Sequence, residues 1–384
     1  MSSANSTLNK FTPSKPGNKR QATWLEVFFD LVFAVAVTQL ASYLNNHSDM
    51  MGFVRYSILF IPVWWAWVGF SYFSDLFDAD RKTYFRVILL MAMLVVLAMA
   101  LNTRDALTAT SFNFAACYTL LQILLISLYV WACKDVEKTK QLCHYFMVGF
   151  CGGAVFWLLS LFVSPPTRFV LWGLGLTVEI ATPLVAYLSV NRKPVHGSHM
   201  PYRLGQFTMI VIGETVAAVA VGVADTQWQL PTIFAAVNGF AIAICFWWLY
   251  FSHMDRTSID RALRSDTKEL LKSFVYGYGH IAIFAGIAAV GVGIELAIET
   301  ASKTNTPIPL FYGAAIALVG LTAVHLVSAY FLPLWAVELR LVTAMLAVIL
   351  AQFNLEPAIA ISCFVLSLLT TVFLEEHYLL TEET

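Results

Sequence analysis

The sequence predicts an all-α membrane protein, a polytopic transmembrane helix bundle of about twelve spans. Of the 384 residues, 59% are hydrophobic and only 12% are charged, whereas soluble domains hold about 45–50% apolar and about 25% charged residues. Apolar stretches of about 20 residues recur along the chain, and each is long enough to cross a hydrocarbon core of about 30 Å. Most of the chain is therefore expected to lie in a lipid bilayer, its first expected partner.

Uninterrupted apolar windows place the individual spans. We expect them near residues 24–44, 53–73, 84–103, 112–132, 143–163, 169–190, 204–223, 230–252, 273–296, 308–331, 335–354 and 357–376. The predicted organisation is a polar tail at 1–23, a first six-helix half at 24–190, a linker at 191–203, a second six-helix half at 204–376 and a C-terminal tail at 377–384. The first apolar stretch contains two acids and is followed by no small-residue cleavage signature, so no removable signal peptide is expected.

Lysine and arginine residues predict the orientation, because they accumulate in short cytosolic loops. With these spans, most of the 23 basic residues fall on the side that holds both termini. The opposite side receives only Arg55, Arg104, Arg168 and Lys303, and Arg340 lies just inside the eleventh span. Both termini and the linker are therefore expected to be cytosolic.

Composition and motifs also limit the classes of function and partner. The formal net charge of -1 gives no reason to expect a nucleic-acid partner. The six cysteines form no CxxC pair, so neither a disulfide framework nor a metal site is expected, and no cofactor is predicted. The chain has no GxSxG, HExxH or Walker A motif and no loop long enough for a soluble catalytic domain, so an enzyme is not expected.

The two halves resemble each other in the positions of their landmarks. The same separation of 183 residues relates Arg20 to Arg203 and the pair Trp64-Trp65 to the pair Trp247-Trp248. Six spans per half make this a parallel duplication with a pseudo-twofold axis along the membrane normal. The alternative is coincidence, because paired tryptophans are common in membrane helices.

Carboxyl groups inside the spans are informative, because a charge near the bilayer centre costs about 2.5–3.5 kcal/mol on insertion scales. In the first span, Glu26 and Asp30 are four residues apart and share a helix face. Two carboxylates on one face suit the binding of a cation or the sharing of a proton. The alternative is that both acids pair with Arg20 or Arg203, as charge partners that fix helix packing.

Two more acids lie near the centres of predicted spans. Glu214 is about ten residues into the seventh span, which places it about 15 Å deep, and Thr215 beside it could supply a hydroxyl. Glu179 is similarly central, and Pro183 four residues later frees a backbone carbonyl in the preceding turn. Each acid is a candidate for carrying protons, and the alternative for each is a neutralised, structural role.

Other polar or aromatic residues in the spans are weaker signals. His280 and His325 are candidates for the same ion pathway, although a lone membrane histidine more often makes a hydrogen bond between helices. The aromatic run at residues 64–73, which includes Trp67, is expected to serve packing, because aromatic residues are common in bundles and interfacial belts.

The proposed duplication predicts where two of the acids meet. Asp30 lies ten residues after Arg20, and Glu214 lies eleven residues after Arg203. We therefore expect Asp30 and Glu214 to lie close together near the pseudo-twofold axis, in one polar site that holds a shared proton, a cation or an arginine. The alternative is that each acid pairs within its own half.

Two segments carry a specific resemblance. They are EVFFDLVFAVAVTQL at 26–40, which opens the first span and includes the candidate site residue Thr38, and YRLGQFTMIVIGET at 202–215. At this separation they resemble the hallmark segments of the bacterial low temperature requirement protein A family, over essentially the whole chain past residue 20. The resemblance implies a multi-spanning protein of the bacterial inner membrane linked to growth at low temperature, and it supplies no substrate.

The first span is also remotely similar to the opening helix of the endolysosomal potassium and proton leak channels and their six-helix bacterial relatives. That helix has an FSD-type motif followed by VFAIAIT, and here Phe28, Phe29 and Asp30 are followed by residues 32–38. Phe29 occupies the serine position, and the second half lacks the FSD pattern. The pore chemistry that this resemblance implies therefore extends no further than Asp30.

Three kinds of function fit these observations. The probable duplication and the buried carboxylates favour a channel or secondary transporter for protons or monovalent cations. The alternatives are a non-transporting membrane factor that supports another complex or lipid order in the cold, and an intramembrane enzyme acting on lipid. The sequence leaves the transported species and a homodimer open.

Overall fold

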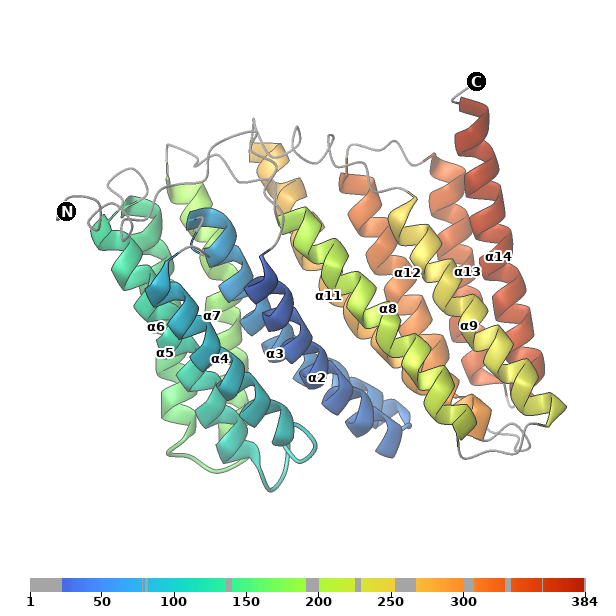
Figure 1. Cartoon of the computed structure of the whole chain (residues 1–384), viewed down its shortest axis with the longest axis horizontal. Coiled ribbons are helices and arrows are strands. Elements are labelled where there is room, and N and C mark those ends of the chain that lie inside the picture. Colours follow the sequence, from blue (N-terminus) through green and yellow to red (C-terminus); the bar gives the residue numbers. More distant parts are fainter. Residues whose placement is uncertain are drawn as a thin grey trace. The chain divides into compact units, whose positions relative to one another are not determined.

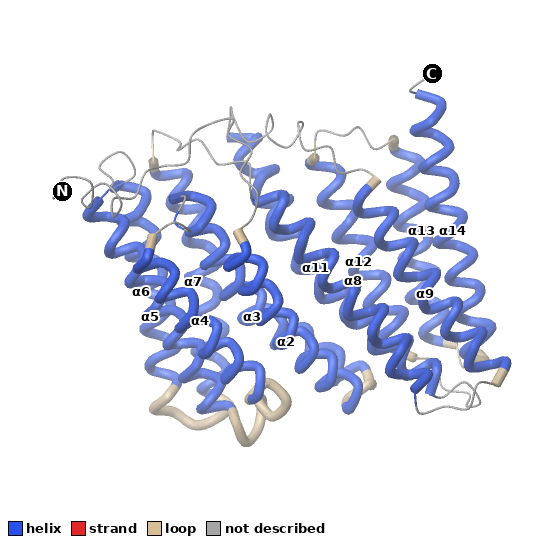
Figure 2. The backbone as a smooth tube through the Cα atoms, in the orientation of Figure 1, coloured by secondary structure: helices blue, strands red, loops and turns tan. Residues whose placement is uncertain are grey.

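The structure is a computed structural model of the whole chain. It describes residues 23–77, 79, 82–135, 140–190, 200–224, 229–252, 267–299, 307–328, 333–353 and 355–382. The described residues form twelve helices and no strand (Figures 1 and 2). The helices are α2 (Trp24–Asn46), α3 (Met50–Phe77), α4 (Thr83–Leu101), α5 (Ser111–Asp135), α6 (Lys140–Ser160), α7 (Thr167–Ser189), α8 (Met200–Ala224), α9 (Leu230–Phe251), α11 (Thr267–Glu299), α12 (Ile308–Val327), α13 (Leu334–Gln352) and α14 (Pro357–Glu382).

Each of these helices is long and apolar enough to cross a membrane. The shortest, α4 and α13, have 19 residues, and at about 1.5 Å per residue such helices approach the roughly 30 Å of a hydrocarbon core. A helix suits this environment because it satisfies its own backbone hydrogen bonds where no water is present. The prediction of an all-α polytopic bundle is confirmed.

Several helices extend past the apolar windows that predicted them. α3 begins three residues before the predicted span and ends four residues after it, α11 begins at Thr267 rather than 273, and α14 continues to Glu382 rather than 376. The added turns are polar, because a helix continues through polar residues as long as its backbone hydrogen bonds are made. In α14 the extension includes Glu375, whose side chain is buried.

The chain divides into two compact units. The first contains residues up to Leu40 and Leu59–Arg203, and the second contains Ala41–Ile58 and Leu204–Thr384. The end of α2 and the beginning of α3 therefore pack with the second unit, where the Asn45 amide donates a hydrogen bond to Glu295 Oε1 at 2.8 Å. The predicted duplication into two six-helix halves stays a prediction.

In the first unit, α4, α5, α6 and α7 pack in chain order, each against the next. Aromatic side chains fill the core that they share with α3. Phe73 meets Tyr129 edge-on with ring centroids 5.0 Å apart, and Tyr129 stacks on Phe146 at 5.3 Å. The hydroxyl groups of Tyr72 and Tyr187 share a hydrogen bond. The aromatic run in α3 therefore contributes to packing.

In the second unit, α11 and α12 form the most extensive helix pair. Glycines allow this close approach, because a Cβ atom placed on Gly286 would lie 2.5 Å from the carbonyl oxygen of Gly313. Close backbone approach through small residues is the usual means of helix association in lipid, where the hydrophobic effect does not drive it. The Tyr56 hydroxyl of α3 also donates to the Ala285 carbonyl of α11, at 2.8 Å.

Candidate functional site

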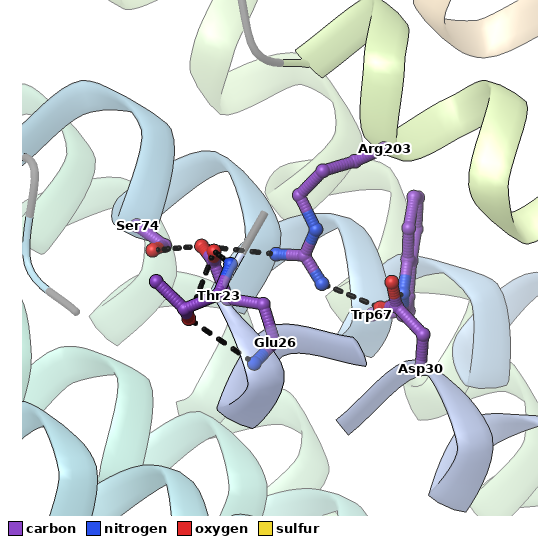
Figure 3. Close-up of polar contacts among 6 residues, drawn as sticks. All are labelled: Thr23, Glu26, Asp30, Trp67, Ser74 and Arg203. Carbon is purple, nitrogen blue, oxygen red and sulfur yellow. Dashed lines mark hydrogen bonds and ion pairs between the residues drawn. The ribbon is translucent and has the colours of Figure 1, made fainter. Parts of the chain in front are cut away.

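Six residues of the first unit form a polar group that we call the Arg203 cluster (Figure 3). The first turns of α2 supply Glu26 and Asp30, α3 supplies two further side chains, and Arg203 reaches the group from the first turn of α8. The members are Thr23, Glu26, Asp30, Trp67, Ser74 and Arg203. Glu26, Asp30 and Arg203 are each at most 3% exposed, so their charges must be neutralised locally.

Glu26 has a structural role at the beginning of α2. The backbone N–H of Thr23 donates to Glu26 Oε2 at 2.9 Å, and the backbone N–H of Glu26 points back to the Thr23 hydroxyl at 3.4 Å. This reciprocal arrangement of Thr and Glu three residues apart is a capping box, which satisfies backbone donors at a helix N-terminus. The Ser74 hydroxyl donates to the other oxygen, Oε1, at 2.5 Å. Both oxygens of Glu26 are therefore engaged.

Asp30 is engaged on one oxygen only. Its Oδ1 accepts the indole N–H of Trp67 at 2.7 Å and one guanidinium N–H of Arg203 at 2.5 Å. Its Oδ2 is buried and has no hydrogen-bond partner among the described residues. Asp30 is thus a carboxyl group with one saturated oxygen and one oxygen able to accept a further donor or a proton.

Arg203 lies between the two acids (Figure 3). Its NH2 pairs with Asp30, while its NH1 lies 3.9 Å from Glu26 Oε1, beyond hydrogen-bond distance. The guanidinium group also lies over the Trp67 ring, with its central carbon 5.5 Å from the ring centroid, a favourable cation–π geometry. Its Nε has no hydrogen-bond partner in the described part of the chain. The pairing of Arg203 is therefore incomplete.

The other charge partner suggested by the sequence, Arg20, lies outside the described residues. Thr38, on α2, is half-buried and donates to its own helix at the Ala34 carbonyl. Asp30 belongs to the first unit and Glu214 to the second. The predicted joint site of these two acids stays a prediction.

Glu179 forms a second polar group in the first unit, separate in its partners from the Arg203 cluster. The Tyr118 hydroxyl and the Gln122 amide, both on α5, donate to Glu179 Oε2 at 2.5 Å and 2.8 Å. The side chain of Glu179 is completely buried, and Oε1 has no hydrogen-bond partner among the described residues.

In the second unit, Glu214 and Thr215 are consecutive but differ in their surroundings. Thr215 is buried and donates to the Ile287 carbonyl of α11 at 3.1 Å. Glu214 is half-buried on α8, near Glu295 of α11. Thr215 therefore joins two helices, while Glu214 remains beside another acid.

The two candidate histidines are both held by neighbours on other helices. The Tyr250 hydroxyl of α9 bonds to His280 Nε2 at 2.9 Å, and His280 Nδ1 lies 2.7 Å from the Tyr276 carbonyl. Because the carbonyl can only accept, Nδ1 carries the ring proton and Nε2 accepts from the hydroxyl. His280 is thus a neutral imidazole with both nitrogens satisfied, which is the arrangement of a bond between helices.

His325 belongs to a buried charged group in the second unit, which we call the Arg340 cluster. Arg340 of α13 is fully buried, and its Nε and NH2 each donate to one oxygen of Glu375 on α14, both at 2.6 Å. Its NH1 lies 2.7 Å from His325 Nδ1 on α12. The Arg340 cluster, made of His325, Arg340 and Glu375, ties three helices together.

Sequence reasoning missed several of these partners. The T-x-x-E spacing of Thr23 and Glu26 could have indicated the capping box, and the G-x-x-x-G spacing of Gly149 and Gly153 could have indicated close packing of α6. Trp67 was expected only to pack, yet it bonds to Asp30. No sequence signal relates Trp67, Ser74, Tyr118, Gln122 or Glu375 to the acids and bases that they meet, because these contacts depend on tertiary packing.

Comparison with known proteins is consistent with this architecture. The chain matches the family described as "Bacterial low temperature requirement A protein (LtrA)" over residues 21–374, which include both hallmark segments. It is also 24% identical to the uncharacterized protein RA0937 of Rhizobium meliloti (strain 1021) over 312 residues, which are 79% of this chain and 75% of that relative. This multi-pass membrane protein belongs to the bacterial low temperature requirement A family.

Proposed function

We propose that the protein carries protons across the membrane, as a channel or a proton-coupled secondary transporter, and that Asp30 is the group that binds the proton. The observation that carries this proposal is the state of the Asp30 carboxyl. It is buried, both of its donors meet Oδ1, and Oδ2 is open. A proton can therefore be added to Oδ2 without displacing an existing hydrogen bond.

Protonation of Asp30 would change the balance between the two acids that flank Arg203. While Asp30 is ionised, its attraction holds the guanidinium through NH2. Once Asp30 is neutral, the ion pair is lost, and Glu26 Oε1 at 3.9 Å from NH1 becomes the nearby charge that the guanidinium can approach. Proton binding is thus linked to a movement of Arg203, and through it to the start of α8.

The surroundings of Asp30 favour a proton over a metal cation. A monovalent cation in a protein is held by several oxygen atoms, whereas the partners of Asp30 are an indole N–H and a guanidinium, both of which donate. Arg203 also adds a positive charge where the cation would bind. A proton needs only one oxygen lone pair, which Oδ2 offers.

The test is proton flux in liposomes that contain the purified protein and a trapped pH-sensitive dye, with the membrane potential clamped. We expect wild-type vesicles to dissipate an imposed pH gradient faster than empty vesicles, and Asp30→Asn to return the rate to that of empty vesicles. Asp105→Asn makes the same chemical change at an exposed residue of the α4–α5 loop, and it should keep the wild-type rate.

Two results would overturn the proposal. If wild-type vesicles dissipate the gradient no faster than empty ones, the protein is better explained as a non-transporting membrane factor. If Asp30→Asn matches the wild type, another group binds the proton. A lipid composition altered by deletion of the gene, together with absent flux, would instead favour an intramembrane enzyme.

A further inference from the structure

The interface between α6 and α7 leaves room for a carboxyl group deep in the first unit. Gly149 and Gly153 are four residues apart on α6 and so lie on one face of that helix. A Cβ atom on Gly149 would lie 2.1 Å from the Thr182 hydroxyl oxygen, and one on Gly153 would lie 2.7 Å from Glu179 Oε1. The two glycines therefore create the space in which Thr182 and Glu179 of α7 lie.

The donors around Glu179 all meet one of its oxygens. Tyr118 and Gln122 donate to Oε2, and the Gln122 amide also donates to the Tyr118 hydroxyl oxygen at 3.0 Å. Oε1 faces the bare backbone of Gly153 and has no hydrogen-bond partner among the described residues. This asymmetry matches a protonated carboxylic acid, in which Oε2 is the carbonyl oxygen and Oε1 carries the proton.

The charges around Glu179 support the neutral form. Among the described residues, Glu179 forms no ion pair, and the titratable side chain that contacts it is Tyr118 of α5. From α6 it faces Gly153, and its neighbours along α7, Gly175 and Thr182, do not titrate. An ionised carboxylate buried without a cation loses far more solvation energy than two neutral donors restore.

Two further buried polar atoms nearby are unsatisfied. Gln122 Oε1 and Trp157 Nε1 have no hydrogen-bond partner in the described residues, although Gln122 bonds to Glu179 and the Trp157 ring lies on Tyr118 with centroids 3.9 Å apart. Pro183, inside α7, has no N–H to bond to the Glu179 carbonyl. Native proteins leave few buried polar atoms unpaired, so a group of them marks a place where a proton or water is exchanged.

We infer that Glu179 is a second proton-binding site of this protein, which takes up and releases a proton at Oε1 while Tyr118 and Gln122 hold Oε2. The site has its own partners and does not depend on the proposed role of Asp30. It concerns where a proton is held, not whether protons cross the membrane. A purely structural side chain would need only the acceptor at Oε2, which a glutamine also provides.

Infrared spectroscopy of the folded protein tests this directly. In the difference between wild type and Glu179→Gln, we expect the carbonyl stretch of a protonated carboxyl group at neutral pH and its replacement by carboxylate bands at alkaline pH. Glu299→Gln, a control at an exposed acid, should give only carboxylate bands at neutral pH. Carboxylate bands alone for Glu179 at both pH values would overturn the inference.

If Glu179→Gln does not fold, labelling of the wild-type protein decides. Dicyclohexylcarbodiimide reacts with protonated carboxyl groups in apolar surroundings: the O–H adds across one C=N bond, the proton goes to nitrogen, and no group leaves. Mass spectrometry should find the adduct on Glu179 and not on Glu375, which is ionised against Arg340. An unmodified Glu179, or equal modification of Glu375, would overturn the inference.

Discussion

Two buried arginines of this chain, one in each unit, meet their carboxylates in different ways. Arg340 uses Nε and NH2 for both oxygens of Glu375 and NH1 for His325. Arg203 makes one short bond to Asp30 and leaves its Nε without a partner among the described residues. The side chains are chemically alike, but the Arg340 cluster is saturated and the Arg203 cluster is not.

This difference decides which cluster can respond to protons. Arg340 cannot give up its own proton, so NH1 donates and His325 Nδ1 accepts. A proton added to that nitrogen would remove the hydrogen bond and place two cations side by side. Asp30, in contrast, can accept a proton at Oδ2 without losing a bond. The saturated cluster therefore suits a structural role, and the unsaturated one suits titration.

The hydroxyl groups beside the Arg340 cluster strengthen the same conclusion. Thr343 of α13 shares hydrogen bonds with Thr371 at 3.0 Å and Ser367 at 3.1 Å, both on α14. These bonds lie on the same pair of helices as the bidentate ion pair. α13 and α14 are thus joined by several polar contacts in addition to their packing.

The largest expected effect is on stability, from Glu375→Gln. This change leaves Arg340 buried beside an amide, and removing one partner of a buried ion pair typically costs about 3–5 kcal/mol. The free energy of unfolding in detergent micelles should fall by this amount. Glu376→Gln is the matched control, because the adjacent Glu376 only accepts a hydrogen bond from Trp248 at an exposed position, and a glutamine can accept the same bond. A loss below about 1 kcal/mol for Glu375→Gln would contradict the structural role of the pair.

A smaller loss of stability is expected for Asp30→Asn. The asparagine oxygen can still accept from Trp67 and Arg203, and Oδ2 has no described hydrogen-bond partner to lose. The cost is the weakening of charge-assisted bonds, about 1–3 kcal/mol in the free energy of unfolding. The variant should therefore purify as a folded protein even though its proton flux is lost. An unfolding cost equal to that of Glu375→Gln would remove the distinction between the two clusters.

The contrast between the two clusters also separates what the sequence could predict from what it could not. The twelve spans were predictable because each is a continuous apolar stretch near the length of the hydrocarbon core. Arg203 was recognisable as a charge partner because a charge beside a span needs one. Glu375 was not, because it lies near the end of the last apolar window and meets Arg340 from another helix only after packing.

The choice of oxygen within each acid was equally hidden. No spacing in the sequence tells that Asp30 would be bonded through Oδ1 alone, or that Tyr118 and Gln122 would meet the same oxygen of Glu179. These details follow from the orientation of side chains across three helices. The sequence could indicate that the acids needed partners, but the structure is required to find which ones are incompletely satisfied.

The smallest expected effect comes from Thr23→Ala, which tests whether Glu26 is held independently of Arg203. The change removes the hydroxyl that bonds with Glu26, at 3.2 Å to Oε2, and the loss of such a cap typically costs about 1 kcal/mol. Glu26 keeps the Thr23 backbone N–H at 2.9 Å and the Ser74 hydroxyl at 2.5 Å, so its carboxylate should stay in place. Proton flux should therefore match the wild type.

Thr23→Ser restores the hydroxyl and is the control for the cap. It should recover the free energy of unfolding that Thr23→Ala loses, measured in the same detergent. If Thr23→Ala instead abolishes flux while the protein stays folded, the position of Glu26 is as critical as that of Asp30. The Arg203 cluster would then act through both acids together, and the assignment of the capping box to structure and of Asp30 to proton binding would be wrong.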